Sequence, residues 1–127
     1  SISFAPDGGV NASGMAYGFI MSIFNPRSDG YSSVGLQKAT NQLIESLRSY
    51  NPDMRVSREQ GNIRVSGKNA LSKILSNSSH AGGRERDWLV TLMASDGLLY
   101  FVFVAPEAEF SEYQKTFRQI LNSVRLY

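Results

Sequence analysis

Residues 87–106, DWLVTLMASDGLLYFVFVAP, constrain the fold more than any other stretch of the chain. Two runs rich in Leu, Val, Phe and Tyr flank the pair Asp96-Gly97. An Asp-Gly pair between apolar runs is a strong β-hairpin signal, because a type I′ turn needs positive φ at both of its central residues. The sequence therefore predicts two long antiparallel strands joined by a tight turn at Asp96-Gly97.

The predicted turn also decides which side chains share a face of the sheet. With Asp96-Gly97 at its centre, Ser95 pairs with Leu98. One face then carries Trp88, Val90, Leu92, Ala94, Leu99, Phe101 and Phe103. The other face carries Leu89, Thr91, Met93, Ser95, Leu98, Tyr100, Val102 and Val104. Apolar residues on both faces are typical of central strands covered on both sides. We expect the main helical layer on the Trp88 face and thinner cover on the Tyr100 face.

The rest of the chain supplies further strands and two helices. Alternating or short apolar runs predict strands at residues 2–6, 15–24, 54–58, 63–65 and 70–76, with a second hairpin turning at residues 60–62. Apolar residues at three- and four-residue spacing predict helices at residues 34–50 and 111–124. Ser32 or Ser33 is the expected cap of the first helix, and Ser111 with Gln114 has the spacing of a capping box. The order strands, helix, strands, helix predicts an α+β domain with a mainly antiparallel sheet of about six to seven strands.

Composition fits one globular domain and excludes several kinds of function. The 127 residues are 42% hydrophobic and 19% charged, which suits a single folded core. The absence of cysteine excludes disulfides and thiolate chemistry. Thirteen basic residues are interleaved with eleven acidic ones, so no basic stripe points to nucleic acid. No apolar run approaches the roughly 20 residues of a membrane span. Because the chain begins at Ser1, inside a predicted strand, we expect a domain excised from a larger protein.

No familiar catalytic, cofactor or metal constellation is present. The single histidine, His80, cannot supply the three or four ligands of a zinc site. A triad of Ser79, His80 and Asp87 is disfavoured, because sequence-adjacent Ser and His rarely meet at the required angle and no GxSxG elbow occurs. The acidic residues near position 110 suit a helix N-terminus rather than paired-carboxylate chemistry. The sequence therefore predicts a domain without an active site, a cofactor or a metal.

The charged run Arg84-Glu85-Arg86-Asp87 allows two interpretations. It is either a solvated strand end whose charges pair across the sheet or an anion or partner site. The second interpretation gathers His80, Arg84, Arg86 and Asp87, with the loop that contains His80 as a flexible lip. A small-ligand pocket near Tyr100, Thr91 and the His80 loop stays open as a third possibility.

Several passages resemble known families. The element order, the turn VSGKNA at residues 65–70 and the closing segment that ends ILNSVR at residue 125 resemble the PsbP-like superfamily, which includes PsbP and the Ran-binding Mog proteins. The stretches ATNQLIESLR, GGRERDWLVT and DGLLYFVFVAPE resemble a C-terminal domain of some bacterial HtpX-like zinc metalloproteases. The chain lacks the HExxH motif of those enzymes, so no catalytic residue carries over.

These resemblances imply a non-catalytic accessory domain. The first hypothesis is a protein-interaction or substrate-positioning domain, outside the cytoplasm, whose partner is another protein or its own parent protease domain. The alternative is a small-ligand-binding module of an extracytoplasmic lipoprotein. A stand-alone hydrolase ranks last. A structure without an apolar cavity and without a cluster of converging polar groups would rule out the ligand module.

Overall fold

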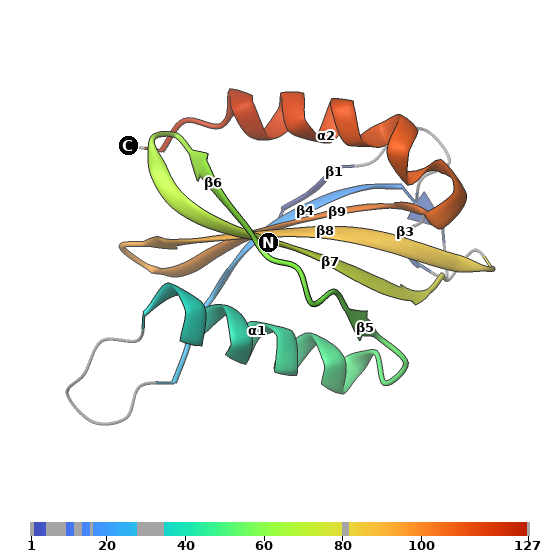
Figure 1. Ribbon diagram of the computed structural model, residues 1–127, viewed down its shortest axis with the longest axis horizontal. Helices are drawn as coiled ribbons and strands as arrows, with labels where there is room; N and C mark the ends of the chain where they lie inside the picture. Colours follow the sequence, from blue (N-terminus) through green and yellow to red (C-terminus); the bar gives the residue numbers. More distant parts are fainter. Residues whose placement is uncertain are drawn as a thin grey trace.

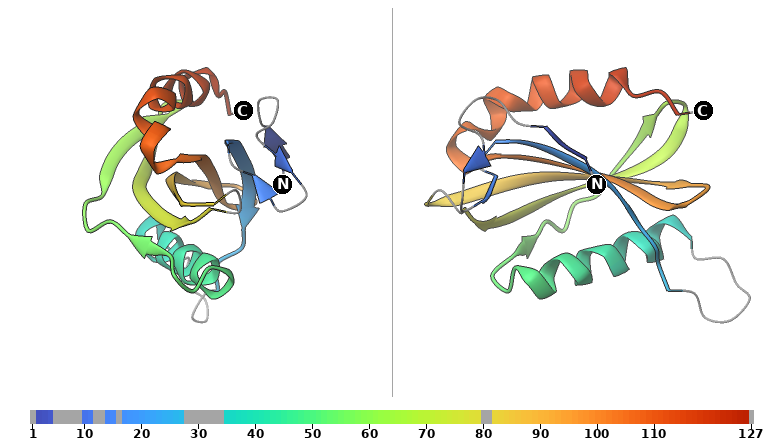
Figure 2. Two further views of the ribbon diagram at one scale, coloured as in Figure 1. Left: turned by 90° about the vertical axis from the view of Figure 1, so that its right-hand side faces the viewer. Right: turned by 180° about the vertical axis from the view of Figure 1, so that it is seen from behind.

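An open antiparallel sheet of seven strands carries one helix on each face (Figures 1 and 2). The computed structural model describes residues 2–4, 10–11, 14–15, 17–27, 35–79 and 82–126. The elements are β1 (Ile2–Phe4), β2 (Val10–Asn11), β3 (Gly14–Met15), β4 (Gly18–Phe24), α1 (Leu36–Tyr50), β5 (Arg55–Val56), β6 (Gly61–Val65), β7 (Lys68–Ser78), β8 (Arg84–Ala94), β9 (Gly97–Pro106), the 3-10 turn η1 (Glu107–Glu109) and α2 (Phe110–Ser123). The strand order is β1-β4-β9-β8-β7-β5, and β6 also pairs with β7. The predicted α+β class and element order are confirmed.

The central hairpin of β8 and β9 forms as predicted, but its turn lies one residue earlier. Ala94 pairs with Gly97, so Ser95 and Asp96 occupy the turn and Gly97 begins β9 with φ of 137°. A Cβ on Gly97 would lie 2.8 Å from the carbonyl oxygen of Phe24, at the end of the neighbouring strand β4. The predicted type I′ turn at Asp96-Gly97 is therefore wrong. The shift preserves the alternation of the strands, so the predicted division of side chains between the two faces is correct.

The second hairpin also turns at a different place from the predicted one. Residues 60–62 do not form a turn between two strands, because β5 and β6 both pair with β7 rather than with each other. The chain reverses instead at Ser66-Gly67, where φ is 52° and 78°. Positive φ at both central residues is the requirement of a type I′ turn. The predicted strand over residues 15–24 is likewise two strands, β3 and β4.

Both helices end within one residue of the predicted position, but their N-termini differ from the prediction. Gly35 is the N-cap of α1 and makes no side-chain capping bond. The predicted caps Ser32 and Ser33 lie outside the described residues. Helix α2 begins at Phe110 with Glu109 as its N-cap, so Ser111 lies inside the first turn and the predicted capping box is wrong. The preceding η1 brings the chain into helical geometry earlier than the Ser111 pattern indicated.

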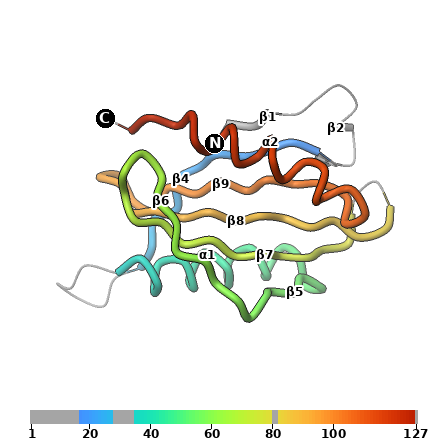
Figure 3. Tube along the Cα trace, turned by 45° about the horizontal axis from the view of Figure 1, so that its top comes forward, coloured from blue at the N-terminus to red at the C-terminus, as the bar shows by residue number. Residues whose placement is uncertain are grey.

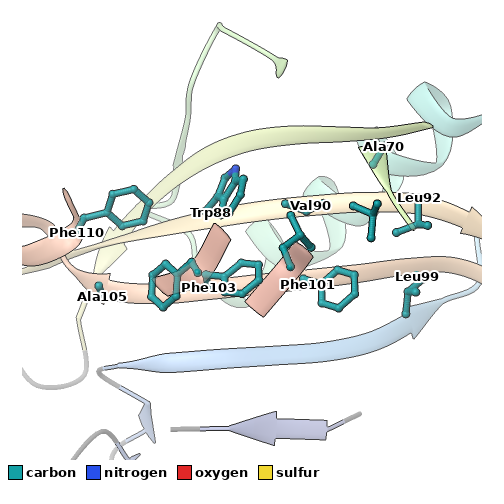
Figure 4. Packing of buried hydrophobic residues seen from close by; sticks show 12 residues of the cluster. Ala70, Trp88, Val90, Leu92, Leu99, Phe101, Phe103, Ala105 and Phe110 are labelled. Atoms are coloured by element: carbon teal, nitrogen blue, oxygen red, sulfur yellow. The ribbon is translucent and has the colours of Figure 1, made fainter. Parts of the chain in front are cut away.

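Each helix buries one of the two predicted faces. Helix α2 packs on the Trp88 face, where the described core has twelve buried residues and includes the aromatic cluster of Figure 4. Helix α1 packs on the Tyr100 face, where nine described residues form a second buried core. Both faces are thus covered, and the smaller core lies on the side for which thinner cover was predicted.

A buried pair of hydroxyls joins α1 to the middle of the sheet. Thr40 and Thr91 are each about 1% exposed or less, and their Oγ1 atoms lie 2.8 Å apart. The Thr40 hydroxyl donates to the carbonyl oxygen of Leu36 at 2.8 Å. Since a hydroxyl has one proton, the hydrogen bond between the two threonines must be donated by Thr91.

This direction makes the two threonines unequal under substitution. Thr40→Val leaves the Thr91 donor buried without an acceptor and is expected to cost about 1–3 kcal/mol of unfolding free energy. Thr91→Val leaves Thr40 bonded to Leu36 and should cost less, about 1 kcal/mol or below. Urea denaturation of both variants and of the double variant measures the difference. Equal costs for the two single variants would show that the donor assignment is wrong.

Candidate functional site

A cavity of about 240 Å³ lies between α1 and the sheet, near the C-terminal end of the helix. The strands β4, β9, β8 and β7 that form its floor run side by side in Figure 3. Its lining residues are Ile20, Leu47, Asn51, Met54, Leu75, Asn77, Glu85, Asp87, Tyr100, Val102 and Val104. The walls are therefore mainly aliphatic, with polar side chains gathered where β7 ends and β8 begins.

Three of the polar residues, Asn77, Glu85 and Asp87, are almost fully buried. Their exposed fractions are 7%, 7% and 5%. The Asn77 amide donates from Nδ2 to Oδ2 of Asp87 at 2.9 Å. The other oxygens of this pair, Oδ1 of Asn77 and Oδ1 of Asp87, have no hydrogen-bond partner among the described residues. Buried polar atoms are nearly always paired, so two adjacent exceptions in the wall of a cavity are unusual.

The environment of Asp87 favours its neutral form. Burial raises the pKa of Asp87 to about 9, and the neighbouring Glu85 carboxyl adds to the rise through a hydrogen bond and through charge repulsion. The Asn77 amide opposes the rise by donating to the carboxylate. Asp87 is therefore protonated at neutral pH and can act as a hydrogen-bond donor as well as an acceptor. The two carboxyls together can hold a proton, exchange it or accept hydrogen bonds from a ligand.

The two-residue period of β8 explains why these carboxyls point into the cavity. Side chains of a strand alternate between faces, so Glu85 and Asp87 share the face of Leu89, which α1 covers. The interpretation of residues 84–87 as a solvated strand end is therefore wrong for Glu85 and Asp87. Carboxylates are rarely buried this fully without a partner, and here the strand pairing of β7 with β8 places Asn77 beside them.

The two arginines of the predicted site point to the opposite face. Arg86 makes an ion pair of 3.0 Å with Glu107 and lies 5.9 Å from the centre of the Phe110 ring. Arg84 donates through Nε and one terminal nitrogen to Oγ of Ser76, each at 3.1 Å. The structure thus separates Arg84 and Arg86 from Asp87, while His80 lies outside the described residues. The predicted site does not form as one cluster around Asp87.

Sequence reasoning named only part of the cavity. Tyr100 lines the cavity, as predicted. Thr91 is not among the lining residues, and its hydroxyl is hydrogen-bonded to Thr40. Glu85 and Asn77 were not predicted as site residues. The alternation Arg-Glu-Arg-Asp was the signal available for Glu85, because it places both acids on the apolar side of Leu89.

A second cavity of about 230 Å³ lies on the α2 side, near β6 and β7. Its lining is more polar, and Arg118 from α2 stacks over the Trp88 ring at 5.2 Å. No buried side-chain atom that lacks a partner lies among its described lining residues. The first cavity is therefore the stronger candidate for a site.

Two features are absent from the part of the chain that the structure describes. No group of three or more His, Cys, Asp and Glu side chains is arranged to hold a metal ion there. No helix there is long and apolar enough to cross a membrane.

Comparison with known proteins identifies the fold. No protein-family model and no curated protein matches the chain. Among solved structures, the crystal structure of PA94 from Pseudomonas aeruginosa, a protein of unknown function, superimposes with a TM-score of 0.64. The alignment covers 99% of this chain and 96% of that chain at 8% sequence identity. The chain therefore shares its α+β fold with that protein, and similarity at this level of identity shows the fold alone.

Proposed function

We propose that this domain is a non-catalytic binding module that takes a small organic ligand in the cavity between α1 and the sheet. The observation that carries the proposal is the pair of unpartnered buried oxygens, Oδ1 of Asn77 and Oδ1 of Asp87, in the cavity wall. Leaving buried polar atoms unpaired costs free energy. A ligand that supplies their missing hydrogen bonds would recover that cost on binding.

The shape and lining of the cavity support a ligand of modest size. At the packing density of protein interiors, a volume of 240 Å³ holds roughly ten non-hydrogen atoms. Aliphatic side chains from four elements surround most of that space, and the polar groups converge at one end. Apolar walls with a few converging polar groups are the usual composition of small-molecule sites.

The protein-interaction hypothesis has less support in the described surface. Ile23 and Tyr50 are the large hydrophobic side chains exposed there, at 41% and 82%, and they lie on β4 and at the end of α1. Two separate residues do not form the contiguous apolar patch typical of a docking surface. The PsbP-like relationship, the role as accessory domain of a metalloprotease-like protein and the extracytoplasmic location stay predictions, which the sequence of the full-length gene would test.

The binding proposal predicts a specific response to two probes of suitable size, 2-phenylethanol and 2-phenylethylammonium. At least one of them should shift the backbone amide resonances of Asn77, Asp87 and Tyr100 in a two-dimensional NMR titration. Ile20→Trp should weaken that binding at least about tenfold, because an indole at the cavity wall occupies space that the ligand needs.

Ile23→Trp is the matched control for this experiment. Ile23 lies on the same strand as Ile20 but does not line the cavity, so an indole there should leave the binding unchanged. If neither probe shifts the cavity resonances of the wild-type protein, the proposed function is wrong. Equal weakening by both substitutions would place the binding outside this cavity.

A further inference from the structure

We propose that the ligand of this cavity is an organic ammonium with a short apolar body, whose head is held by Asn77, Glu85 and Asp87. This inference rests on the proposed binding function and names the class of ligand. It is carried by the position of the unpartnered oxygens, by the charge of the lining side chains and by the distribution of apolar surface.

The unpartnered atoms call for a ligand that donates hydrogen bonds. With its Nδ2 committed to Asp87, Asn77 presents its Oδ1 as an acceptor. When Asp87 is ionised, its Oδ1 is the second free acceptor of the pair. A primary ammonium has three N–H donors and no acceptor, as the lysine head group does. A ligand carboxylate would instead bring acceptors towards acceptors.

The charge of the cavity selects a cation over a neutral donor. The described lining contains two carboxyls, Glu85 and Asp87, and includes no lysine or arginine. The nearest arginines along the strand, Arg84 and Arg86, point to the opposite face. Arg84 is hydrogen-bonded to Ser76, and Arg86 forms an ion pair with Glu107. A carboxyl pair that is buried without a cation is poorly compensated, and charge-assisted hydrogen bonds to a bound ammonium would compensate it.

The proton on Asp87 and the ammonium group of such a ligand compete for the same carboxylate. Burial and Glu85 keep Asp87 protonated at neutral pH, and an arriving ammonium would stabilise the ionised form instead. Binding should therefore release a proton to the solvent. The other elements that face the pair bring few titratable groups: Tyr100 from β9 lines the cavity, while α1 and its C-cap contribute Leu47 and Asn51 and β7 contributes Leu75 and Asn77.

Three probes that share one body and differ in head group test the inference: 2-phenylethylammonium, 2-phenylethanol and phenylacetate. At pH 8.5 the ammonium should bind the wild-type protein at least about tenfold more tightly than the alcohol, and phenylacetate should bind most weakly. The affinity for the ammonium should rise between pH 6 and pH 8.5, since alkylammonium groups stay charged there and deprotonation of Asp87 becomes easier. Titration calorimetry in buffers of different ionisation enthalpy should detect the released proton.

Two cavity variants and one surface variant sharpen the result. Asp87→Asn should remove both the pH dependence and the preference for the ammonium, and Glu85→Gln offers a second route should the first variant fold poorly. Asp96→Asn, in the exposed turn between β8 and β9, should change neither. If the alcohol or phenylacetate binds as tightly as the ammonium at pH 8.5, the inference is wrong and the binding function stands. If no probe binds the cavity, the proposed function fails and the inference fails with it.

Discussion

Replacing Phe103 with alanine is expected to remove about 3–5 kcal/mol of unfolding free energy, the largest effect of any single substitution considered for this protein. Phe103 is fully buried, and its ring centre lies 5.0 Å from that of Phe117, 5.3 Å from Trp88 and 5.4 Å from Phe19. These neighbours come from α2, β8 and β4, so one ring joins the helix to three strands, its own strand β9 included. Figure 4 shows the rings of Phe103 and Trp88 on adjacent strands.

The expected loss of unfolding free energy in Phe103→Ala has two causes. Removing the ring forfeits its transfer from water, and the rigid aromatic neighbours cannot collapse fully into the space left behind. Because domains are typically stable by only about 5–15 kcal/mol, the variant should be close to the limit of folding at body temperature. Urea denaturation followed by the fluorescence of the single tryptophan, Trp88, measures the change.

Ile23→Ala provides the comparison for Phe103→Ala. Ile23 is on the same face of the neighbouring strand but is 41% exposed, so its truncation should cost clearly less than half as much. A Phe103→Ala loss no greater than that of Ile23→Ala would mean that the aromatic cluster does not organise the α2 side of the core.

Asp87→Asn is expected to stabilise the protein at neutral and alkaline pH and to flatten its pH dependence. The pKa of Asp87 is about 9 in the folded protein and about 3.9 in an unfolded chain. Between these values the folded state binds one proton more than the unfolded state, so wild-type stability falls as pH rises, by up to about 1.4 kcal/mol per pH unit. Asparagine does not titrate and resembles the protonated acid in shape.

The two proteins should therefore diverge between pH 5 and pH 7 by up to about 3 kcal/mol, and the wild-type loss should end above about pH 9. Chemical denaturation at several pH values provides the measurement. Asp96→Asn, in the exposed turn, should follow the wild-type curve. If Asp87→Asn had the same pH slope as the wild-type protein, Asp87 would not carry the extra proton in the folded state.

The central hairpin shows how far local reasoning reaches. Apolar density and the Asp-Gly pair were sufficient to predict both strands and their two faces, because alternation is a local property of the chain. The position of the turn was wrong by one residue, since Gly97 is also packed against Phe24 of β4. Nothing in residues 87–106 indicates that contact. The turn at Ser66-Gly67 lies within the predicted turn at residues 65–70. The additional hairpin predicted at residues 60–62 does not form, because β5 and β6 both pair with β7, and that pairing is not encoded locally.

The candidate site shows where local reasoning stops. Residues 84–87 have the charge that is typical of a solvated strand end. The partly exposed ion pair between Arg86 and Glu107 agrees with that interpretation. The alternation of side chains along β8 directs Glu85 and Asp87 towards the interior, although their charge is typical of a solvent-exposed position. Burial of the two acids depends on α1 covering the end of the sheet, and that cover is a tertiary contact between segments about forty residues apart in sequence.

By itself, the sequence determined the fold class, the two helices and the division of the hairpin between two buried faces, because these follow from periodicities of two and 3.6 residues. Only the tertiary structure decided which strands pair and where α1 lies, and with them which polar groups lose their water. In the sequence, nothing distinguishes Asp87 from an exposed, ionised aspartate. It becomes a protonated acid beside the unpartnered Oδ1 of Asn77 because β7, β8 and α1 meet around it and exclude the solvent that would otherwise keep it ionised.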